Sequence, residues 1–534
     1  MIPLFKDKPS WLKSRGYLHV TPKLDILKDY YRIYSNVTDE EYVKKHGFFP
    51  LIHAVIKERK YKKHPDFPKI RGHVLKIKNK FEPSAKLRPL HYSTHIDSII
   101  FGYYASIISD LYEQELRTHD KLADCVTAYR KIKLEKKDDK IVGKSTIHFA
   151  NEAFEAIKRY GETECVVLMF DIKGFFSNLN HNKLKEAWCG LLKETKLNDA
   201  QFNVFKAITD FRYILKDDLR LKSSNKRRRA GFDEAKLAYI RKTIGTDSFF
   251  ESIKAFKQAL KNKEIKVYKN PFYRDGKMVG IPQGLPISAT LANLYLLDFD
   301  KSVLNEVVIN KGGFYRRYSD DILIICKPDE AETVEEFITK EIKESFVEIS
   351  EAKTEKFLFK NVQISPKITR LTPFLLTKDG EIQGRPLTYL GFEFYGYKTL
   401  IKSSNLAKFY RRMIYLVKRK AKRAVNLFDS DLSEKPVIYR GRLIRKYKIL
   451  KLESYKQVRY RKVFEKKEDG TFLIRKEEIK PKKNPKGENN NKFSTTYLTY
   501  VRRASKIMGE RSILNQVKKH KNIFNTAIKN HLKE

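Results

Sequence analysis

Cysteine is scarce in this sequence: four cysteines occur among 534 residues, far apart from one another. No Cys-x-x-Cys pair exists, so neither a zinc site nor a disulfide framework is indicated, and a reducing cytoplasmic setting fits. No apolar run approaches the length of a transmembrane helix, and the opening MIPLFKDKPSW lacks the apolar core of a signal peptide. We therefore expect no membrane partner. The cysteines are Cys125, Cys165, Cys189 and Cys326.

Acidic residues are few relative to basic ones. Lys and Arg number 110 against 65 Asp and Glu, which gives a formal net charge of +45. A charge this large predicts a polyanionic partner, for which nucleic acid fits better than a membrane. The excess is greatest in residues 401–534, which hold 38 basic and 12 acidic residues. A hydrophobic content of 41% excludes a disordered chain, and the length predicts two to four domains.

Hydrophobic periodicity predicts a chain of mixed helices and strands. Helices are expected over 22–36, 39–57, 96–119, 182–192, 330–348 and 405–428. Extended structure is expected over 71–95, 125–131 and 165–170, with hairpins over 314–326, 372–396 and 458–479. Residues 200–278 are charge-rich with helical patches, 481–492 resemble a flexible linker, and two short helices end the chain.

Two adjacent carboxylates stand out in the stretch FYRRYSDDILIIC, residues 314–326. Strand-forming residues flank Ser319, Asp320 and Asp321, which predicts a tight hairpin with the acids at its tip. An ordinary surface turn has the same composition. If the acids are buried, however, they repel each other, and a bound divalent cation is the usual remedy.

Other polar residues occupy positions that suit the same chemistry. The apolar run 165–170 predicts a strand buried on both faces that ends in Asp171, either a turn-capping acid or a metal ligand. The loop GIPQGLP presents Gln283 ahead of a helix that begins at Ser288. Such a loop suits contact with a nucleotide or phosphate, although a plain loop-to-helix junction has the same pattern. Four basic sites are solvated faces or, alternatively, phosphate contacts: Lys86, Arg88, Arg130 and the run 226–229.

Taken in chain order, these motifs resemble the palm of reverse transcriptases. FDIKGFFSNLNH, GIPQGLPISATLANLYLLDFD with its late acid Asp300, YSDD, ISEAKTEKF and LTYLGFEFYG resemble the five successive palm motifs, and KLRPL and TAYRK resemble finger motifs. The resemblance implies an α+β right-hand polymerase. Its expected parts are an N-terminal extension over 1–70, fingers over 71–165, a palm over 166–400 with a basic insertion at about 210–275, and a basic, mainly helical thumb and RNA-binding region over 401–534.

The resemblance also implies residue roles in adding dNTPs to a 3′ hydroxyl with two Mg²⁺ ions. It implies that Asp171 and Asp320 bridge the ions, with Asp321 and the Ile172 carbonyl assisting. Lys353, or alternatively Lys356, would assist the leaving pyrophosphate. The expected nucleotide contacts are Phe176, which would exclude ribonucleotides, together with Gln283, Lys86, Arg88 and Arg130. The expected primer support is Leu390, Gly391 and Phe392.

Within the family, the chain resembles bacterial enzymes of the defence-associated or abortive-infection type. This implies a cytoplasmic enzyme that copies a structured non-coding RNA template into DNA in antiviral defence, with a homo-oligomer possible. A retron or group II intron-like enzyme, an untemplated or protein-primed DNA polymerase, an RNA-dependent RNA polymerase and a non-catalytic RNA-binding scaffold remain open. The sequence alone does not distinguish the template or the primer.

Overall fold

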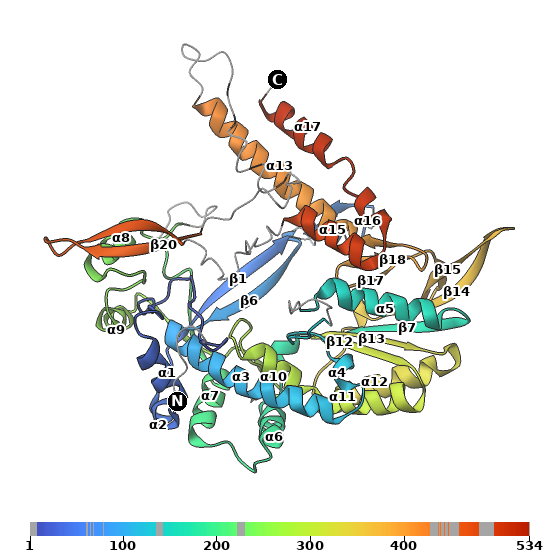
Figure 1. The fold of residues 1–534 in the computed structure, drawn as a ribbon, viewed down its shortest axis with the longest axis horizontal. Helices are drawn as coiled ribbons and strands as arrows, with labels where there is room; N and C mark the ends of the chain where they lie inside the picture. The colour runs from blue at the N-terminus through green and yellow to red at the C-terminus, as the bar shows by residue number, and fades with distance from the viewer. Residues whose placement is uncertain are drawn as a thin grey trace, which may run out of the picture.

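The computed structural model describes residues 8–532 except for several segments. The excepted residues are 60–61, 65, 68, 78–79, 135–142, 222–229, 428–435, 437, 439–442, 444–446, 448–458 and 480–495. Figure 1 shows a central sheet with helices on both faces and a long helix projecting from it. No helix in the part of the chain described here has the length and apolarity needed to span a bilayer.

The central sheet has the strand order β12-β13-β7-β14-β15-β16, and all neighbouring strands run antiparallel. In the middle lies β7 (Glu164–Asp171), as its continuous apolar run predicts. Its neighbours are β13 (Asp321–Cys326) and β14 (Glu355–Ser365). The outer strands are β12 (Phe314–Tyr318), β15 (Ile368–Thr377) and β16 (Gly380–Gln383).

Side chains of β7 alternate between two hydrophobic cores, as a strand with a period of two requires. Val166, Leu168 and Phe170 belong to a first core, while Cys165 and Val167 belong to a second. Helices α3 (His95–Thr118), α6 (His181–Leu192), α7 (Asp199–Thr209), α10 (Ser288–Tyr295), α11 (Leu297–Val303) and α12 (Ala331–Glu344) build the first core. Helix α5 (Thr146–Tyr160) and a small sheet of β17 (Leu387–Tyr389), β18 (Phe392–Phe394) and β19 (Thr399–Ile401) build the second.

A second sheet corrects one prediction. Its order is β6-β1-β8-β9, formed by β6 (Ala85–Tyr92), β1 (Leu51–Arg59), β8 (Arg212–Leu215) and β9 (Val267–Lys269). The helix predicted over 39–57 is wrong beyond α2 (Glu40–Lys45), because 51–59 forms a strand that pairs with β6 and β8. Within the predicted insertion at 210–275, β8 pairs with β1 and β9 pairs with β8, so both strands belong to this second sheet.

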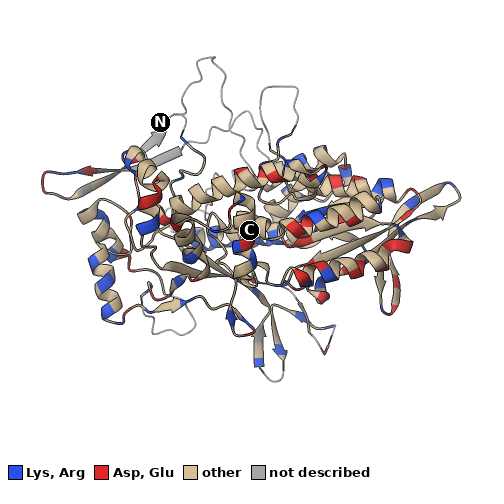
Figure 2. Cartoon of the chain, turned by 90° about the horizontal axis from the view of Figure 1, so that it is seen from below, with Lys and Arg blue, Asp and Glu red and all other residues tan. Residues whose placement is uncertain are grey.

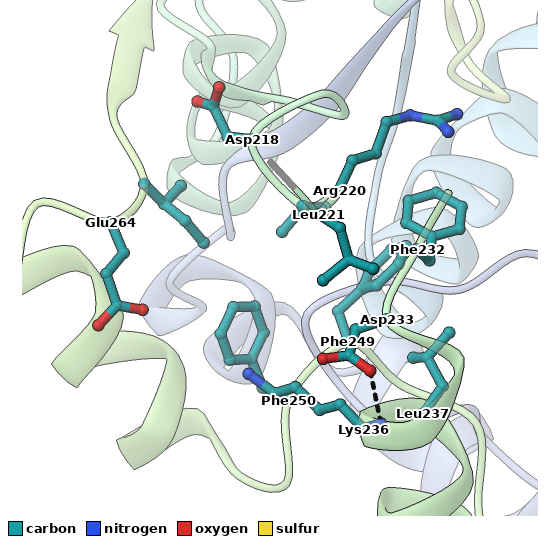
Figure 3. A pocket seen from close by; sticks show the side chains of 12 residues that line it. Asp218, Arg220, Leu221, Phe232, Asp233, Lys236, Leu237, Phe249, Phe250 and Glu264 are labelled. Carbon is teal, nitrogen blue, oxygen red and sulfur yellow. Dashed lines mark hydrogen bonds between the residues drawn. The ribbon is translucent and has the colours of Figure 1, made fainter. Parts of the chain in front are cut away.

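The insertion also contributes most of a third, small core, built with α8 (Glu234–Ile244) and α9 (Ile253–Lys261), to which Val20 and Ile52 also belong. A pocket of about 190 Å³ lies there. Figure 3 shows that phenylalanines and charged side chains of both signs line it. Asp233 accepts a hydrogen bond from the Lys236 backbone N–H at 2.9 Å and so caps α8 at the pocket wall. None of the predicted site residues lines this pocket.

The basic C-terminal region begins with α13 (Ser403–Asn426), close to its predicted bounds. This helix buries Phe409, Met413, Val417 and Ala421 along one face and packs beside α17 (His520–Leu532) (Figure 1). The predicted hairpin is present as β20 (Arg459–Lys466) and β21 (Phe472–Ile479), which lies against α8. Three helices rather than two end the chain, since α15 (Tyr497–Met508) and α16 (Arg511–Asn515) precede α17.

The remaining elements confirm three of the predicted helices and shift a fourth. The helices at 96–119, 182–192 and 330–348 are confirmed as α3, α6 and α12, whereas the helix at 22–36 begins only at Tyr30. The residues predicted as a linker, 481–492, lie outside the described residues. The smaller elements are α1 (Tyr30–Thr38), β2 (Lys62–Lys63), β3 (Arg71–Gly72), β4 (Val74–Ile77), β5 (Lys80–Pro83), α4 (Leu122–Cys125), β10 (Tyr273–Arg274) and β11 (Lys277–Met278). Short 3-10 helices cover Phe175–Ser177, Pro328–Glu330 and Glu351–Lys353, and a π-helix covers Leu304–Asn310.

Candidate active site

The predicted hairpin forms, and its turn carries the two acids. Tyr318 pairs with Asp321 across β12 and β13, which leaves Ser319 and Asp320 as the two residues of the turn. Ser319 has a φ of 61°, a left-handed conformation that costs a non-glycine residue of the order of 1 kcal/mol or more. This tight turn re-aims the chain so that Asp320 and Asp321 both lie at one end of the sheet.

Asp171 reaches the same end of the sheet from the neighbouring strand. It lies directly opposite Asp321 in the antiparallel register of β7 and β13, and directly opposite residues place their side chains on one face. The next residue, Ile172, donates its backbone N–H to the carbonyl of Asp320 at 3.0 Å. The structure thus brings together two pairs of predicted site residues that lie far apart in the sequence.

The carboxylates perturb one another. Burial raises the pKa of Asp321 to about 6, and repulsion from Asp320 and then Asp171 adds to the shift. Burial also raises the pKa of Asp320, with Asp171 contributing in the same direction. Lys353 and Lys86 oppose both shifts. The site therefore favours the approach of positive charge.

Lys353 supplies such a charge, because its ammonium forms an ion pair with the Asp171 carboxylate. The short 3-10 helix Glu351–Lys353 carries it, and the Ser350 N–H anchors this turn to the Asp171 carbonyl at 2.7 Å. Lys356, the alternative from sequence, instead pairs with Glu335 on α12 at 3.2 Å. The ion pair with Asp171 therefore favours Lys353 over Lys356 for a role at the carboxylates.

The residues fit a divalent metal by their chemistry. Within the described ranges, no group of three or more His, Cys, Asp or Glu side chains is arranged so that it could hold a metal ion as it stands. The Lys353 ammonium already lies against Asp171 as a cation would, and the carboxylate oxygens of Asp171, Asp320 and Asp321 are the hard ligands that Mg²⁺ prefers. A metal would thus compete with Lys353 for Asp171.

Sequence reasoning missed the group that holds the turn. The Arg317 side chain is fully buried and forms a bidentate pair with Asp300 on α11, with its Nε 2.7 Å from one carboxylate oxygen. Tyr315 donates its hydroxyl to the same carboxylate at 2.6 Å, and an Arg317 N–H reaches the Ser319 carbonyl at 3.3 Å. The alternation of β12 indicates that Tyr315 and Arg317 face one side, which was the available signal.

Phe176 and the Gln283 loop are neighbours. The Ile281 N–H donates to the Phe176 carbonyl at 2.8 Å, and the Gln283 carbonyl accepts from the His91 N–H at 2.8 Å. Gly284 has a φ of 118°, and a Cβ there would lie 2.6 Å from the His91 carbonyl oxygen. Only glycine therefore suits this close approach, which locks the loop between β6 and the Phe176 turn.

The three predicted basic contacts differ in placement. Lys86 is close enough to lower the pKa of Asp320 and Asp321, so it faces the site. Arg88 lies 3.6 Å from Glu58. Arg130 is buried and bidentate with Glu113 on α3 at 2.7 and 2.8 Å, which occupies its guanidinium within the fold. We therefore propose no phosphate contact for Arg130. The run 226–229 lies outside the described residues.

The predicted primer support forms the tight turn between β17 and β18. Leu390 and Gly391 have φ values of 45° and 91°, and the Lys402 N–H donates to the Gly391 carbonyl at 3.0 Å. Asp321 raises the pKa of the buried Tyr389, after the larger effect of burial, which places this turn beside the carboxylates. Leu390, Gly391 and Phe392 thus approach the site from the second core.

Comparisons with known proteins agree with the sequence of motifs. Residues 229–394 match the family model described as reverse transcriptase (RNA-dependent DNA polymerase). This range includes Gln283, Asp320, Asp321 and Lys353 but begins after Asp171 and Phe176. No curated protein matches the chain.

Solved telomerase structures align over much of the chain at low similarity. The apo telomerase of Candida tropicalis truncated from its C-terminal domain has 11% identity and a TM-score of 0.35, covering 70% of this chain and 60% of that one. The Candida albicans telomerase in complex with a TWJ fragment of telomeric RNA has 10% identity and a TM-score of 0.34, covering 68% and 51%. The present chain thus spans only about half to three fifths of those chains, and the similarity is too low to indicate a shared function. The family match, together with the mixed helix and sheet architecture, leads to one conclusion: residues 229–394 are similar to reverse transcriptases.

Proposed function

We propose that the protein is an RNA-directed DNA polymerase that adds dNTPs to a 3′ hydroxyl at Asp171, Asp320 and Asp321. The observation that carries this proposal is the register of β7 and β13, which sets Asp171 opposite Asp321 and beside Asp320. Burial and mutual repulsion of these acids raise the pKa of Asp321, and bound divalent cations would stabilise the charged carboxylates.

The chain's own residues perform the remaining tasks. Asp171, Asp320, Asp321 and the backbone carbonyl of Ile172 would hold two Mg²⁺ ions. When bound, such a pair of ions stabilises the entering and leaving oxygens of an in-line transfer to the α-phosphate. Lys353, displaced from Asp171, neutralises or protonates the leaving pyrophosphate.

Substrate positioning falls to the residues around the acids. The half-buried ring of Phe176 lies against the ribose 2′ position and excludes ribonucleotides, while Gln283 holds the incoming nucleotide on its locked loop. Lys86 and Arg88 attract the triphosphate. Leu390, Gly391 and Phe392 support the primer from the opposite core.

We further propose that the template is a cognate, structured non-coding RNA and that the basic region 401–534 holds it. The support is the charge of that region and the exposed basic residues along α13, whose buried face is apolar. Figure 2 shows that Lys and Arg also occur on helices and strands throughout the chain. The motif resemblance favours a bacterial, cytoplasmic enzyme acting in antiviral defence.

A primer-extension assay tests the polymerase. Wild-type protein with Mg²⁺, dNTPs and a primed RNA template is expected to extend the primer, and chelation by EDTA is expected to stop it. The double variant Asp320→Ala/Asp321→Ala is expected to lose incorporation while retaining its circular dichroism spectrum and melting transition. Asp298→Ala, an exposed acid on α11, is the matched control. Full activity in the double variant would rule out this site.

RNA binding needs a separate test, because removing α15–α17 would also remove packing residues of the second core. Charge substitution is therefore sharper than deletion. Neutralising Lys418, Arg419, Lys422 and Arg423 on α13 is expected to flatten the slope of log affinity against log salt, by about 0.7 to 0.9 for each phosphate that the variant no longer neutralises. Copurified RNA competing no better than unrelated RNA of equal length would argue against a cognate partner.

A further inference from the structure

Tyr129 combines three properties that an ordinary surface residue lacks. Its side chain is exposed, with 53% of the residue accessible to solvent, although both preceding residues, Thr127 and Ala128, are buried. Its φ of 61° is left-handed, a conformation that costs a tyrosine of the order of 1 kcal/mol or more. Its hydroxyl lies 3.5 Å from the Oγ of Ser319, the turn residue that precedes Asp320.

The segment that carries Tyr129 is fixed on both sides. Val126 bridges to Arg317 of β12, and Thr127 donates both its backbone N–H and its hydroxyl to the Arg317 carbonyl, at 3.0 and 3.1 Å. The Asn293 side chain of α10 donates to the Ala128 carbonyl at 2.8 Å. On the other side, the buried guanidinium of Arg130 is held by Glu113. The residues on both sides of the strained tyrosine are therefore held in place, and the tyrosine lies beside the turn that carries the carboxylates.

The position of Tyr129 relative to the two cores indicates which strand of a bound nucleic-acid duplex it contacts. Cys125 and Val126, which shortly precede Tyr129 in the chain, belong to the first core, whereas Leu390 packs against the second core. The turn with Asp320 lies between them. If Leu390 supports the primer, the strand paired with the primer runs on the opposite side of the turn, over Tyr129. This step rests on the proposed polymerase function.

We propose that Tyr129 is a specificity-determining residue that contacts the template strand and recognises its ribose 2′-hydroxyl. The exposed ring offers a face for sugar or base stacking. The hydroxyl contact to Ser319 is at the outer limit of a hydrogen bond, so it exchanges readily for a better partner. A template 2′-hydroxyl both donates and accepts, which matches the two neighbouring hydroxyls of Tyr129 and Ser319.

Equilibrium binding without dNTPs tests this recognition independently of catalysis. One DNA primer is annealed to RNA and to DNA templates of the same sequence, and both duplexes are titrated with the full-length protein. Tyr129→Phe is expected to weaken the RNA-template duplex by roughly two- to tenfold, the effect of one hydrogen bond, and to leave the DNA-template duplex unchanged. Tyr239→Phe, a similarly exposed tyrosine on α8, is the matched control and should change neither.

A second variant separates the ring from the hydroxyl. Tyr129→Gly suits the left-handed backbone, so it should fold, and it is expected to weaken both duplexes by at least about fivefold through loss of stacking. An RNA-to-DNA preference in Tyr129→Phe equal to that of the wild type would overturn the proposal. Absence of primer extension by the wild-type protein would instead contradict the polymerase function, which the binding ratio does not measure.

Discussion

The central sheet and the second sheet, of order β6-β1-β8-β9, treat buried polar groups in opposite ways. The central sheet buries charges: Arg317 is paired with Asp300, and Asp320 and Asp321 lie beside Asp171. The second sheet and the segment before it bury neutral rings instead, since burial lowers the pKa of His19 and His91 to about 3. The difference shows that ionic groups are buried at the central sheet, whereas the histidines buried in and before the second sheet are held neutral at neutral pH.

Breaking the buried pair is the strongest way to test the palm side of this contrast. Arg317→Met removes one partner and leaves the buried Asp300 carboxylate without its countercharge, although the Tyr315 hydroxyl still donates to it, so the free energy of unfolding should fall by about 3–5 kcal/mol. Urea denaturation followed by fluorescence measures the loss. Lys44→Ala, which breaks an exposed pair with Asp199, is the control and should lower the free energy of unfolding far less. Equal losses in the two variants would mean that the Arg317 pair does not stabilise the turn.

Acidification should destabilise the second sheet and the segment before it more than the central sheet. The pKa of His19, His91 and His95 is lowered to about 3, 3 and 4 by burial, so the unfolded chain binds more protons than the folded one below about pH 6.5. Stability is therefore lost as pH falls from 7 to 5, by about 2 kcal/mol per histidine at pH 5.

Asp321 acts in the opposite sense in metal-free protein, because its folded pKa of about 6 exceeds the ordinary value and the folded state takes up the proton first. Hydrogen exchange at pH 7 and pH 5 should show β1 and β6 losing protection before β7 and β13. Simultaneous loss in both sheets would contradict the contrast.

Phe176 lies where the palm turn meets the loop that is bonded to the fingers strand β6. Phe176→Val shortens the side chain at the expected ribose contact, so use of ribonucleotides relative to dNTPs should rise about tenfold, equivalent to about 1.4 kcal/mol. Competition between dGTP and GTP in primer extension measures the ratio. Phe175→Leu, a buried neighbour in the first core, controls for general loosening of the turn. An unchanged ratio in Phe176→Val would place the sugar discrimination elsewhere.

The sequence predicted the central sheet better than the second sheet for a physical reason. The signals for the central sheet and its surroundings were local: the apolar run before Asp171, the acids between two strand-forming runs, and the Gly/Pro loop before Ser288 each specify a conformation within a short stretch of chain. The second sheet pairs β1 with β8, and β8 with β9, which lie far along the chain from β1, and no local pattern encodes that pairing. The same limit hid the Arg317–Asp300 pair, and it left the burial of Arg130 against Glu113 unforeseen.

The central claim is that Asp171 belongs with Asp320 and Asp321 in one metal-dependent site. Incorporation of dNTP by Asp171→Asn tests it most directly, with thermal melting recorded in parallel with and without Mg²⁺. We predict that incorporation falls at least about a thousandfold, the scale of lost transition-state charge stabilisation. Melting should stay cooperative, and any stabilisation of the wild type by Mg²⁺ should disappear. Wild-type incorporation by Asp171→Asn, with the same response to Mg²⁺, would contradict the claim.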